Sequence, residues 1–347
     1  MKIFTGGSTL DGTNSPVGGE SYLLMSWAKA LAWAGHDVYS SGFLGHDTKT
    51  ENLTFLECNL GESSPDEYDV AIISSGVDVI PQSIASAKVK AKLYIVLYFA
   101  YYQRYIHAFF DTPGYKNVVL AHPFTDPNPL YNPEYCHSDK NKHRDSFFAM
   151  PIPLCESWGK SHCDRKLILW PRKSSLDIPE GAWRSHYAPM ISGAAKLAME
   201  LGKELCFTAS HNVPRDTARI KECIGKCPFT VHPLLYTDKF AEKMENTCMV
   251  LVSDATAERG CSQTTALAMG VLPMTWSAGL AASSMIESGW VYSGGDIYEH
   301  LKKVLCNPVY YDTVLTKAQT SLSDHLYSGC IAHFNKVIEY AKSKEIL

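Results

Sequence analysis

The chain has 347 residues, which is long enough for two α/β domains of about 150 residues each. Hydrophobic residues make up 46% of it and charged residues 20%, a balance that excludes an intrinsically disordered chain and indicates a globular protein. The formal net charge of −4 excludes a general affinity for nucleic acid, although a local basic face can still bind a polyanion.

Cysteine usage and the start of the chain indicate a reducing compartment. Eleven cysteines, an odd number, are scattered without a disulfide framework, and no signal peptide precedes Lys2. No apolar run approaches the roughly 20 residues of a membrane span. We therefore predict a cytoplasmic protein with free thiols. No metal site is predicted, because neither of two cysteine and histidine groups has a standard zinc spacing: Cys223 and Cys227 with His232, and Cys155 with His162 and Cys163.

The first half of the chain alternates predicted strands and helices. A strand at Lys2–Gly6 runs into a loop rich in Gly, Ser, Thr and Asn, and apolar residues at helical spacing then predict a helix at Glu20–Ala34. The remaining predicted elements of this half are strands at His36–Ser40, Asp69–Ser75, Leu93–Phe99, Asn117–His122 and Phe147–Ile152, and a helix at Pro81–Lys92. This alternation is typical of a parallel, doubly wound sheet.

The periodicity lapses around Cys155–Arg165, where we place the linker between two domains. A second sheet then starts with a strand at Lys166–Trp170. The further predicted elements are helices at Ile191–Leu201, Asp238–Asn246, Asp296–Leu305 and Tyr311–Leu322, and strands at Leu205–Ala209 and Phe229–Leu235. The second half therefore repeats the βα rhythm of the first.

The stretch Met249–Gly279 has the most distinctive pattern. A β-branched apolar run predicts a strand that ends at Val252, and a polar loop follows. Ser262 is a candidate N-cap for a short helix that Gly270 stops, and a strand then resumes at Val271–Trp276. In such a βαβ unit the helix N-terminus faces the crevice beyond the strand ends, where backbone N–H groups favour an anion such as a diphosphate.

This stretch resembles the donor-binding segment of GT-B glycosyltransferases, in particular the retaining glycogen-synthase-like group. Ala266–Pro273 matches the family's small-residue turn, with the proline one place later. Glu258 stands near the place of the family's first glutamate, one residue short in spacing, whereas Thr265 occupies the position of the second. Gly18 and Gly19, at the start of the first helix, match the glycine pair that lies close to the donor diphosphate and sugar.

The resemblance implies two Rossmann-like domains separated by a deep cleft. Residues 1–156 would form the acceptor-side domain and 157–324 the nucleotide-sugar-binding domain, with a last helix at 325–347 packing back on the first. The implied activity is transfer of a sugar from a nucleotide donor, a UDP-sugar, to an acceptor hydroxyl with retention. The implied donor-binding residues are Gly18, Gly19, Arg172, Lys173, Ser262, Gln263, Thr264 and Thr265, with Arg184 as an alternative second cation.

In the implied mechanism Glu258 is the catalytic residue, because it hydrogen-bonds the donor sugar and helps to orient the anomeric carbon. Arg172 and the helix terminus offset the charge of the departing nucleotide. For that reason the resemblance implies neither a divalent metal nor a tightly bound cofactor.

Within the class, the chain resembles the DNA α-glucosyltransferases of T-even bacteriophages. The similarity rests on the compact length, the strand Asp69–Ser75 and the position of Trp276 after the turn proline. It implies an acceptor in double-stranded DNA that carries a hydroxymethylated base, and the host cytoplasm as compartment. The basic residues Lys140, Lys142 and Arg144 in a polar loop are then the candidate acceptor-binding residues.

Three other functions remain open at this point. An NAD-binding fingerprint is disfavoured, because Gly6, Gly7 and Gly12 lack the G-x-G-x-x-G spacing and open no helix. A nucleotide-sugar epimerase uses the same architecture, and His122, His211 and Glu258 offer groups for it. A catalytically inactive sugar-nucleotide-binding protein is the third, which Thr265 in place of a glutamate favours. The sequence identifies neither the sugar nor the oligomeric state.

Overall fold

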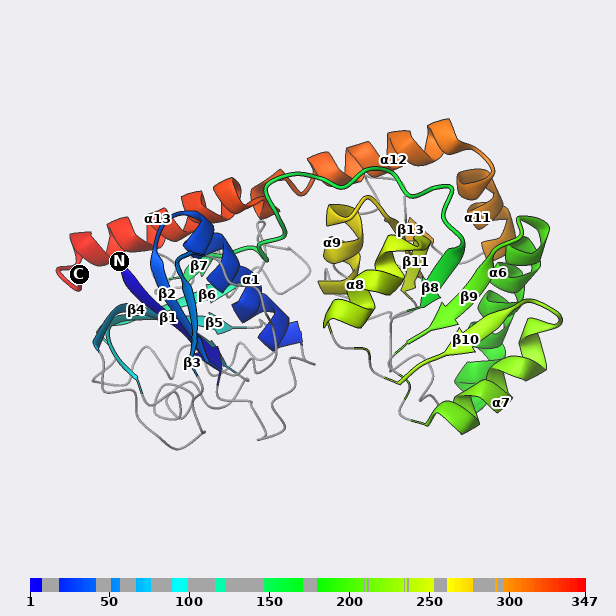
Figure 1. The fold of residues 1–347 in the computed structure, drawn as a ribbon, viewed down its shortest axis with the longest axis horizontal. Coiled ribbons are helices and arrows are strands. Elements are labelled where there is room, and N and C mark those ends of the chain that lie inside the picture. Colours follow the sequence, from blue (N-terminus) through cyan, green and yellow to red (C-terminus); the bar gives the residue numbers. More distant parts are fainter. Residues whose placement is uncertain are drawn as a thin grey trace, which may run out of the picture. The chain divides into compact units, whose positions relative to one another are not determined.

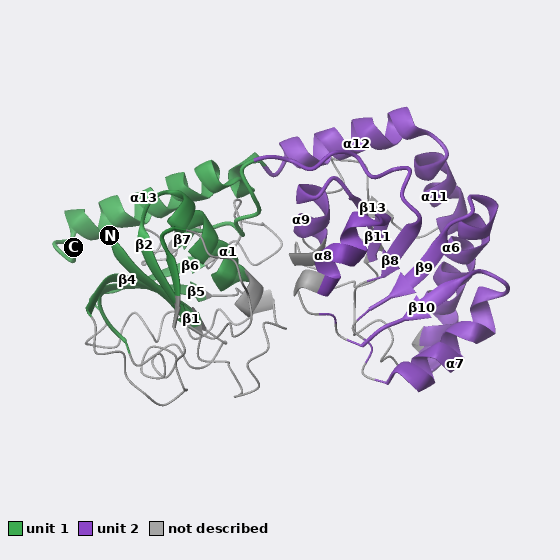
Figure 2. Ribbon diagram, in the orientation of Figure 1, with its two compact units in different colours: residues 1–156, 323–347 green, residues 157–322 purple. Residues whose placement is uncertain are grey.

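A computed structural model describes most of the chain, and the two compact units in it consist of residues 1–156 with 323–347 (unit 1) and 157–322 (unit 2) (Figures 1 and 2). The described residues are 1–7, 19–41, 51–56, 67–75, 89–98, 116–122, 147–170, 180–208, 210, 212–233, 235, 237–252, 261–276, 291–292 and 296–347. No helix in this described part is both long and apolar enough to span a membrane.

Unit 1 contains a parallel sheet with the strand order β3-β2-β1-β4-β5-β6-β7. Its strands are β1 (Lys2–Gly7), β2 (Asp37–Ser41), β3 (Leu53–Leu56), β4 (Glu67–Ser75), β5 (Lys90–Tyr98), β6 (Val118–His122) and β7 (Phe147–Ala149). The middle parts of the central strands are apolar, with Ile3, Ile72 and Ile95 fully buried, as expected for a parallel sheet covered on both faces. The predicted fold class is confirmed for this half of the chain.

Two helices of unit 1 pack on each other as well as on the sheet. In α1 (Gly19–Trp33), Leu23, Trp27 and Leu31 recur at helical spacing and are fully buried. The Trp27 ring lies 6.5 Å from the ring of Phe334, on the C-terminal helix α13 (Tyr327–Ser343). The last helix of the chain therefore belongs to the core of unit 1, beside the first helix (Figure 2).

Unit 2 contains a second parallel sheet, ordered β10-β9-β8-β11-β12-β13. Its strands are β8 (Leu167–Trp170), β9 (Glu204–Phe207), β10 (Phe229–Val231), β11 (Thr247–Val252), β12 (Leu272–Trp276) and β13 (Val291–Tyr292). The helical segments are α5 (Glu180–Ala182), η3 (Trp183–Tyr187), α6 (Ala188–Glu200), α7 (Val213–Ile224), α8 (Thr237–Glu245), α9 (Cys261–Ala268), α11 (Ile297–Leu305) and α12 (Pro308–Thr320). In numbering within the unit, this order is 3-2-1-4-5-6, that of a Rossmann-like sheet.

The chain crosses between the units twice, and unit 1 holds the two crossings together. The buried His325, in the short helix η4 (Ser323–His325), places Nδ1 3.0 Å from the Ile152 carbonyl oxygen, and its own carbonyl accepts from Leu154 N–H at 2.9 Å. One turn further on, the Glu156 carboxylate accepts a hydrogen bond from Ser328 N–H at 2.9 Å, where it serves the N-terminus of α13.

Some predicted elements need correction. The helix predicted at Pro81–Lys92 is wrong at its end, because β5 begins at Lys90 and pairs with β4 along its whole length; residues 76–88 lie outside the described part. The strand predicted at Phe229–Leu235 ends at Val231, and the one at Phe147–Ile152 ends at Ala149. The elements that the sequence analysis missed are β3, α5, η3, α7, β13 and the short helix η4.

Candidate functional site

Unit 2 has a topological switch point between β8 and β11. From β8 the chain continues to β9 on one side, and from β11 it continues to β12 on the other, so the two outgoing connections diverge. A crevice forms at such a point beyond the carboxyl ends of the strands, and ligands of doubly wound sheets bind there. The helix that follows β11 is α9, whose N-terminus begins at this edge.

Several predicted site residues belong to the two connections that leave the switch point. Arg172 and Lys173 follow Trp170, the last residue of β8, in the sequence, and Glu258 stands between β11 and α9. All three lie outside the described residues, as do Gly18, Lys140, Lys142 and Arg144. Gly19 is the first residue of α1, which follows β1 in unit 1. Their roles stay predictions.

Arg184, the alternative second cation, already has a partner. Its Nε donates to the Glu180 carboxylate at 2.7 Å, and Arg219 Nη2 donates to the other oxygen of that carboxylate at 2.9 Å. These bonds, first to Arg184 and then to Arg219, hold the pKa of Glu180 below its usual range. The pairing commits Arg184 to a surface ion-pair network, which favours Lys173 over Arg184 as the partner of Arg172.

The predicted residues of α9 differ in exposure. Gln263 and Thr264 are buried, with 1% and 0% of their surface accessible, and Thr265 is half-buried. Both residues have interactions within the protein. A helix N-terminus offers an anion the backbone N–H groups of its first turn, which does not depend on these two buried side chains.

The C-terminal end of α9 is fully bonded. Val271 N–H donates to the Ala266 carbonyl at 2.8 Å and Gly270 N–H to the Leu267 carbonyl at 3.1 Å, the two bonds of a Schellman motif. Gly270 has φ of +83°, the left-handed conformation that this motif requires and that glycine adopts without strain. The Ala268 carbonyl accepts from Gly159 N–H at 2.7 Å. The predicted glycine stop is thus present and explained.

Side chains of helix α12 hydrogen-bond to the backbone of the βαβ unit formed by β11, α9 and β12, a role that the sequence analysis missed. The buried Tyr311 hydroxyl donates to the Cys248 carbonyl on β11 at 2.6 Å and accepts from Leu272 N–H on β12 at 2.9 Å. Gln319 Nε2 donates to the Leu267 carbonyl of α9 at 2.8 Å. The sequence indicates such a role by placing a tyrosine and a glutamine on the apolar face of this helix, because buried polar groups need hydrogen-bond partners.

Polar groups also gather beyond β9 and β10, at the same edge of the sheet. Ser210 Oγ donates to the buried carboxylate of Asp216 at 2.6 Å, and Arg215 Nη2 lies 2.8 Å from its other oxygen. Ser210 N–H donates to the His232 carbonyl at 3.1 Å. Burial, with a smaller contribution from Lys243, lowers the pKa of His232, so its imidazole is neutral at neutral pH. The sequence analysis did not identify this group.

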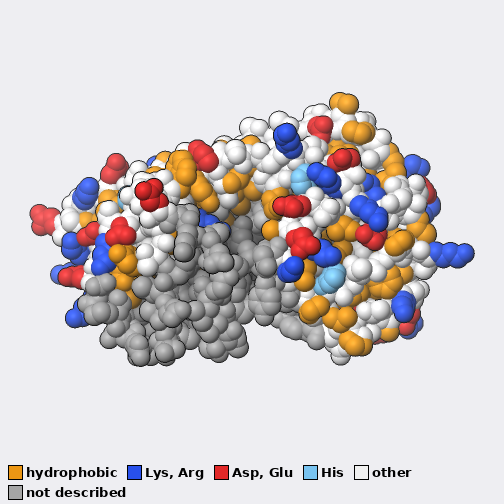
Figure 3. Space-filling model, viewed as in Figure 1, with side chains coloured by type: hydrophobic (Ala, Val, Ile, Leu, Met, Phe, Trp, Pro, Cys, Tyr) orange, Lys and Arg blue, Asp and Glu red, His pale blue; other side chains and the backbone are white. Residues whose placement is uncertain are grey.

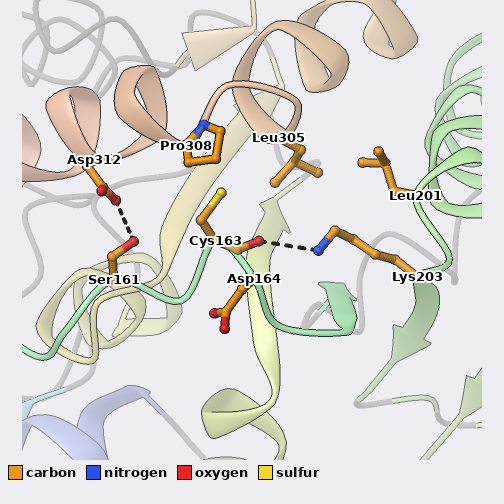
Figure 4. Close-up of a pocket in the computed structure, with 8 residues that line it drawn as sticks. All are labelled: Ser161, Cys163, Asp164, Leu201, Lys203, Leu305, Pro308 and Asp312. Carbon is orange, nitrogen blue, oxygen red and sulfur yellow. Dashed lines mark hydrogen bonds between the residues drawn. The ribbon is translucent and has the colours of Figure 1, made fainter.

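A cavity of about 500 Å³ lies at the opposite, amino edge of this sheet (Figure 4). Its walls come from the segment before β8, the turn between α6 and β9, and the turn between α11 and α12: Ser161, Cys163, Asp164, Leu201, Lys203, Leu305, Pro308 and Asp312. Burial raises the pKa of the Cys163 thiol, which disfavours the nucleophilic thiolate. Because the cavity lies at the amino edge of the sheet, it does not belong to the switch-point site, which lies at the carboxyl edge.

Within the described ranges, no three His, Cys, Asp or Glu side chains are grouped so that they could hold a metal ion. Burial raises the pKa of Cys223 to about 11, as expected for an inert core thiol. On the face displayed in Figure 3, Lys and Arg of unit 2 are interspersed with Asp and Glu, so its described residues present no broad basic area there.

Similarity to solved structures decides the architecture. A glycosyltransferase involved in avilamycin A biosynthesis matches with a TM-score of 0.61 and 15% identity, over 98% of this chain and 97% of its own. An α-glucosyltransferase in complex with UDP-glucose and DNA containing an abasic site matches with 0.58 and 13%, over 97% and 98%. The chain has the GT-B fold.

The GT-B fold accounts for both Rossmann-like sheets and for the last helix in unit 1. It is not restricted to transferases: a UDP-N-acetylglucosamine 2-epimerase from Listeria monocytogenes, described as putative, matches with a TM-score of 0.57 and 11% identity, over 98% of this chain and 97% of its own. No protein-family model and no curated protein matches the chain in sequence. At identities this low the likeness establishes the fold alone.

Proposed function

We propose that the protein is a glycosyltransferase that moves a sugar from a nucleotide-sugar donor, a UDP-sugar, to an acceptor hydroxyl with retention. The observation that carries the proposal is the switch point of unit 2. The connections that leave it contain Arg172 and Glu258, and the second of them leads into α9. The α-glucosyltransferase of the same fold that was solved with UDP-glucose supports the donor class.

In the proposed donor complex, the diphosphate lies at the N-terminus of α9. Backbone N–H groups of the first turn of α9 donate to it, and the helix dipole adds a favourable field. Arg172, assisted by Lys173, neutralises the nucleotide diphosphate as the glycosidic bond breaks.

Glu258 is the proposed catalytic residue. Its carboxylate accepts hydrogen bonds from hydroxyls of the donor sugar and orients the anomeric carbon toward the acceptor. Because cationic side chains and a helix terminus offset the leaving charge, the proposed mechanism requires no divalent metal. Glu258→Gln should reduce turnover by more than tenfold, or about 1.4 kcal/mol. UDP affinity should stay within about threefold, because the proposed contacts of Glu258 are to the sugar and not to the nucleotide. Turnover that survives within threefold would remove Glu258 from this role.

The proposed acceptor is a hydroxymethylated base in double-stranded DNA. One α-glucosyltransferase with the same fold was solved with UDP and a 13-mer DNA that contains an HMU base. Lys140, Lys142 and Arg144 would supply phosphate contacts, which provide most non-specific DNA affinity. The enzyme would have to flip the target base out of the duplex or find it already exposed.

The epimerase of the same fold makes nucleotide-sugar epimerisation the second candidate. Donor consumption with and without acceptor separates the candidates. A transferase releases UDP at a rate that depends on the acceptor, whereas an epimerase converts the donor sugar alone. A protein that binds UDP but does neither, as Thr265 in place of the second glutamate would allow, is a binding protein. The proposed function predicts acceptor-dependent release of UDP together with a glycosylated product.

A further inference from the structure

The chain enters unit 2 through residues 157–165, the entry segment, and this segment docks on the C-terminal end of α9. Gly159 N–H donates to the Ala268 carbonyl at 2.7 Å, and His162 N–H donates to the Gly270 carbonyl at 3.1 Å. The partners are about 110 residues apart in the sequence, so the contact is wholly tertiary. The entry segment thus supplies hydrogen bonds that the last turn of a helix cannot make within itself.

Two glycines make this docking possible. A Cβ on Gly159 would lie 2.4 Å from the carbonyl carbon and oxygen of Met269, and a Cβ on Gly270 would lie 1.8 Å from the Lys160 carbonyl oxygen. Both obstacles are backbone atoms, which cannot rotate away as the end of a side chain can. Any larger residue at either position must push the entry segment and the end of α9 apart.

The entry segment is also fastened on its other side, next to the cavity described above. Ser161 Oγ donates to Asp312 Oδ1 on α12 at 2.5 Å. Lys203, the residue before β9, donates from Nζ to the Cys163 carbonyl at 3.2 Å (Figure 4). The same Nζ donates to the Arg165 carbonyl at 2.6 Å. Because these bonds anchor the segment, a clash at Gly159 is relieved more readily by a shift of α9.

Helix α9 transmits such a shift from one end to the other. It has eight residues, or about 12 Å at 1.5 Å per residue, and helices this short are not stable alone. Its position is therefore set by what it packs against. We propose that Gly159 and Gly270 are positioning residues, through which the entry segment fixes the N-terminus of α9 and hence the donor diphosphate. This inference rests on the proposed function for its ligand.

The test compares three alanine variants of unit 2. Gly159→Ala introduces the clash with α9. Gly193→Ala introduces an equally short contact elsewhere, 2.4 Å from Ile297 Cγ2 between α6 and α11, and Gly181→Ala meets nothing within 4 Å. Each variant is studied at the same temperature interval below its own Tm. The measurements are hydrogen exchange of the α9 backbone amides without nucleotide, and UDP affinity by calorimetry.

We expect faster exchange throughout α9 and an increase of about tenfold or more in the Kd for UDP in Gly159→Ala alone. Gly193→Ala should lose thermal stability but keep its UDP affinity within about threefold. If Gly159 had only a structural role, the two variants would not differ in UDP affinity in this way. Equal α9 exchange in Gly159→Ala and Gly193→Ala would overturn the proposal. Wild-type protein that binds no UDP would refute the proposed function instead, and the exchange comparison would still decide how α9 is positioned.

Further variants keep the test decisive if Gly159→Ala does not fold. Gly270→Ala is paired with Gly225→Ala: both glycines have positive φ, +83° and +63°, but a Cβ on Gly225 meets nothing within 4 Å. Ser161→Ala loses the bond to Asp312 and introduces no clash. Faster α9 exchange in Gly270→Ala than in Gly225→Ala, with a smaller increase in Ser161→Ala, supports the proposal. Unchanged α9 exchange in Ser161→Ala and no excess in Gly270→Ala overturn it.

Discussion

Tyr311 completes the hydrogen bonding between two strands from outside the sheet. Its hydroxyl lies between the Cys248 carbonyl of β11 and the Leu272 N–H of β12, at the amino ends of the two strands that frame α9. Burial raises the pKa of Tyr311 well above its ordinary value, so the hydroxyl remains a proton donor under all native conditions. The residue is fully buried, and water cannot replace the bridge.

Tyr311→Phe should therefore destabilise unit 2. It leaves one buried N–H and one buried carbonyl without this partner, and each such group costs about 1–3 kcal/mol. Urea unfolding of the full chain measures the loss, and Tyr310→Phe is the matched control because that neighbouring ring is only half-buried and bridges no strands. If the two variants unfolded at the same urea concentration, the bridge would contribute nothing.

Three histidines make stability depend on pH. Burial is the main cause that lowers the pKa of His36, His232 and His333 in the folded protein. As pH falls below about 6.5, the unfolded chain binds protons that the folded chain binds only at lower pH, so stability falls from there until the lowered pKa values are passed. The Tm should drop between about pH 7 and pH 5. His232→Gln should reduce that drop.

At the scale of elements, the sequence identified those whose patterns have a local cause. The strand, helix and glycine stop around α9 were predictable because Gly270 must adopt a positive φ, and the core of α1 because Leu23, Trp27 and Leu31 share one face. Strands β3 and β13 have only four and two residues, too few to show an alternation. Their pairing depends on strands distant in sequence.

The wrong helix end at Lys90–Lys92 and the missed helix α7 have different physical explanations. Lys90–Lys92 reads as the end of a helix, but β4 recruits it into the sheet, and Lys92 there pairs with Asp69 at 2.9 Å. The sequence contains an N-cap signal for α7. The Asn212 side chain accepts from Arg215 N–H, and Pro214 follows in the first turn. That helix could have been predicted.

The candidate site was predictable in part, for the same reason. The positions of Arg172 and Glu258 after two strands follow from the order of elements, and that order is visible in the sequence. The docking of Gly159 on the end of α9 is not, because it joins residues about 110 positions apart through backbone contacts that no motif encodes. Nor does the sequence reveal that Gln263 and Thr264 are buried.

For the whole molecule, the DNA acceptor gives a prediction about salt. The net charge of −4 does not favour DNA, so a local basic strip must carry the binding. Affinity for hydroxymethylated duplex should fall steeply with added salt, and neutralising Lys140, Lys142 and Arg144 together should reduce the log–log slope by up to about 2.7, or 0.9 per phosphate contact. An unchanged slope would remove these residues, and absence of binding at low salt would remove DNA as acceptor.

The central claim is that unit 2 binds a nucleotide diphosphate at the switch point beside α9. Calorimetric titration with UDP and with uridine tests it most directly, using wild-type protein, Arg172→Ala and the control Lys226→Ala, an exposed residue before the amino end of β10. We expect UDP to bind much more tightly than uridine. Arg172→Ala should weaken UDP binding by about 1.5–3 kcal/mol, more than tenfold in Kd, while Lys226→Ala changes little. Equal affinity for uridine and UDP, or an unchanged Kd in Arg172→Ala, would contradict it.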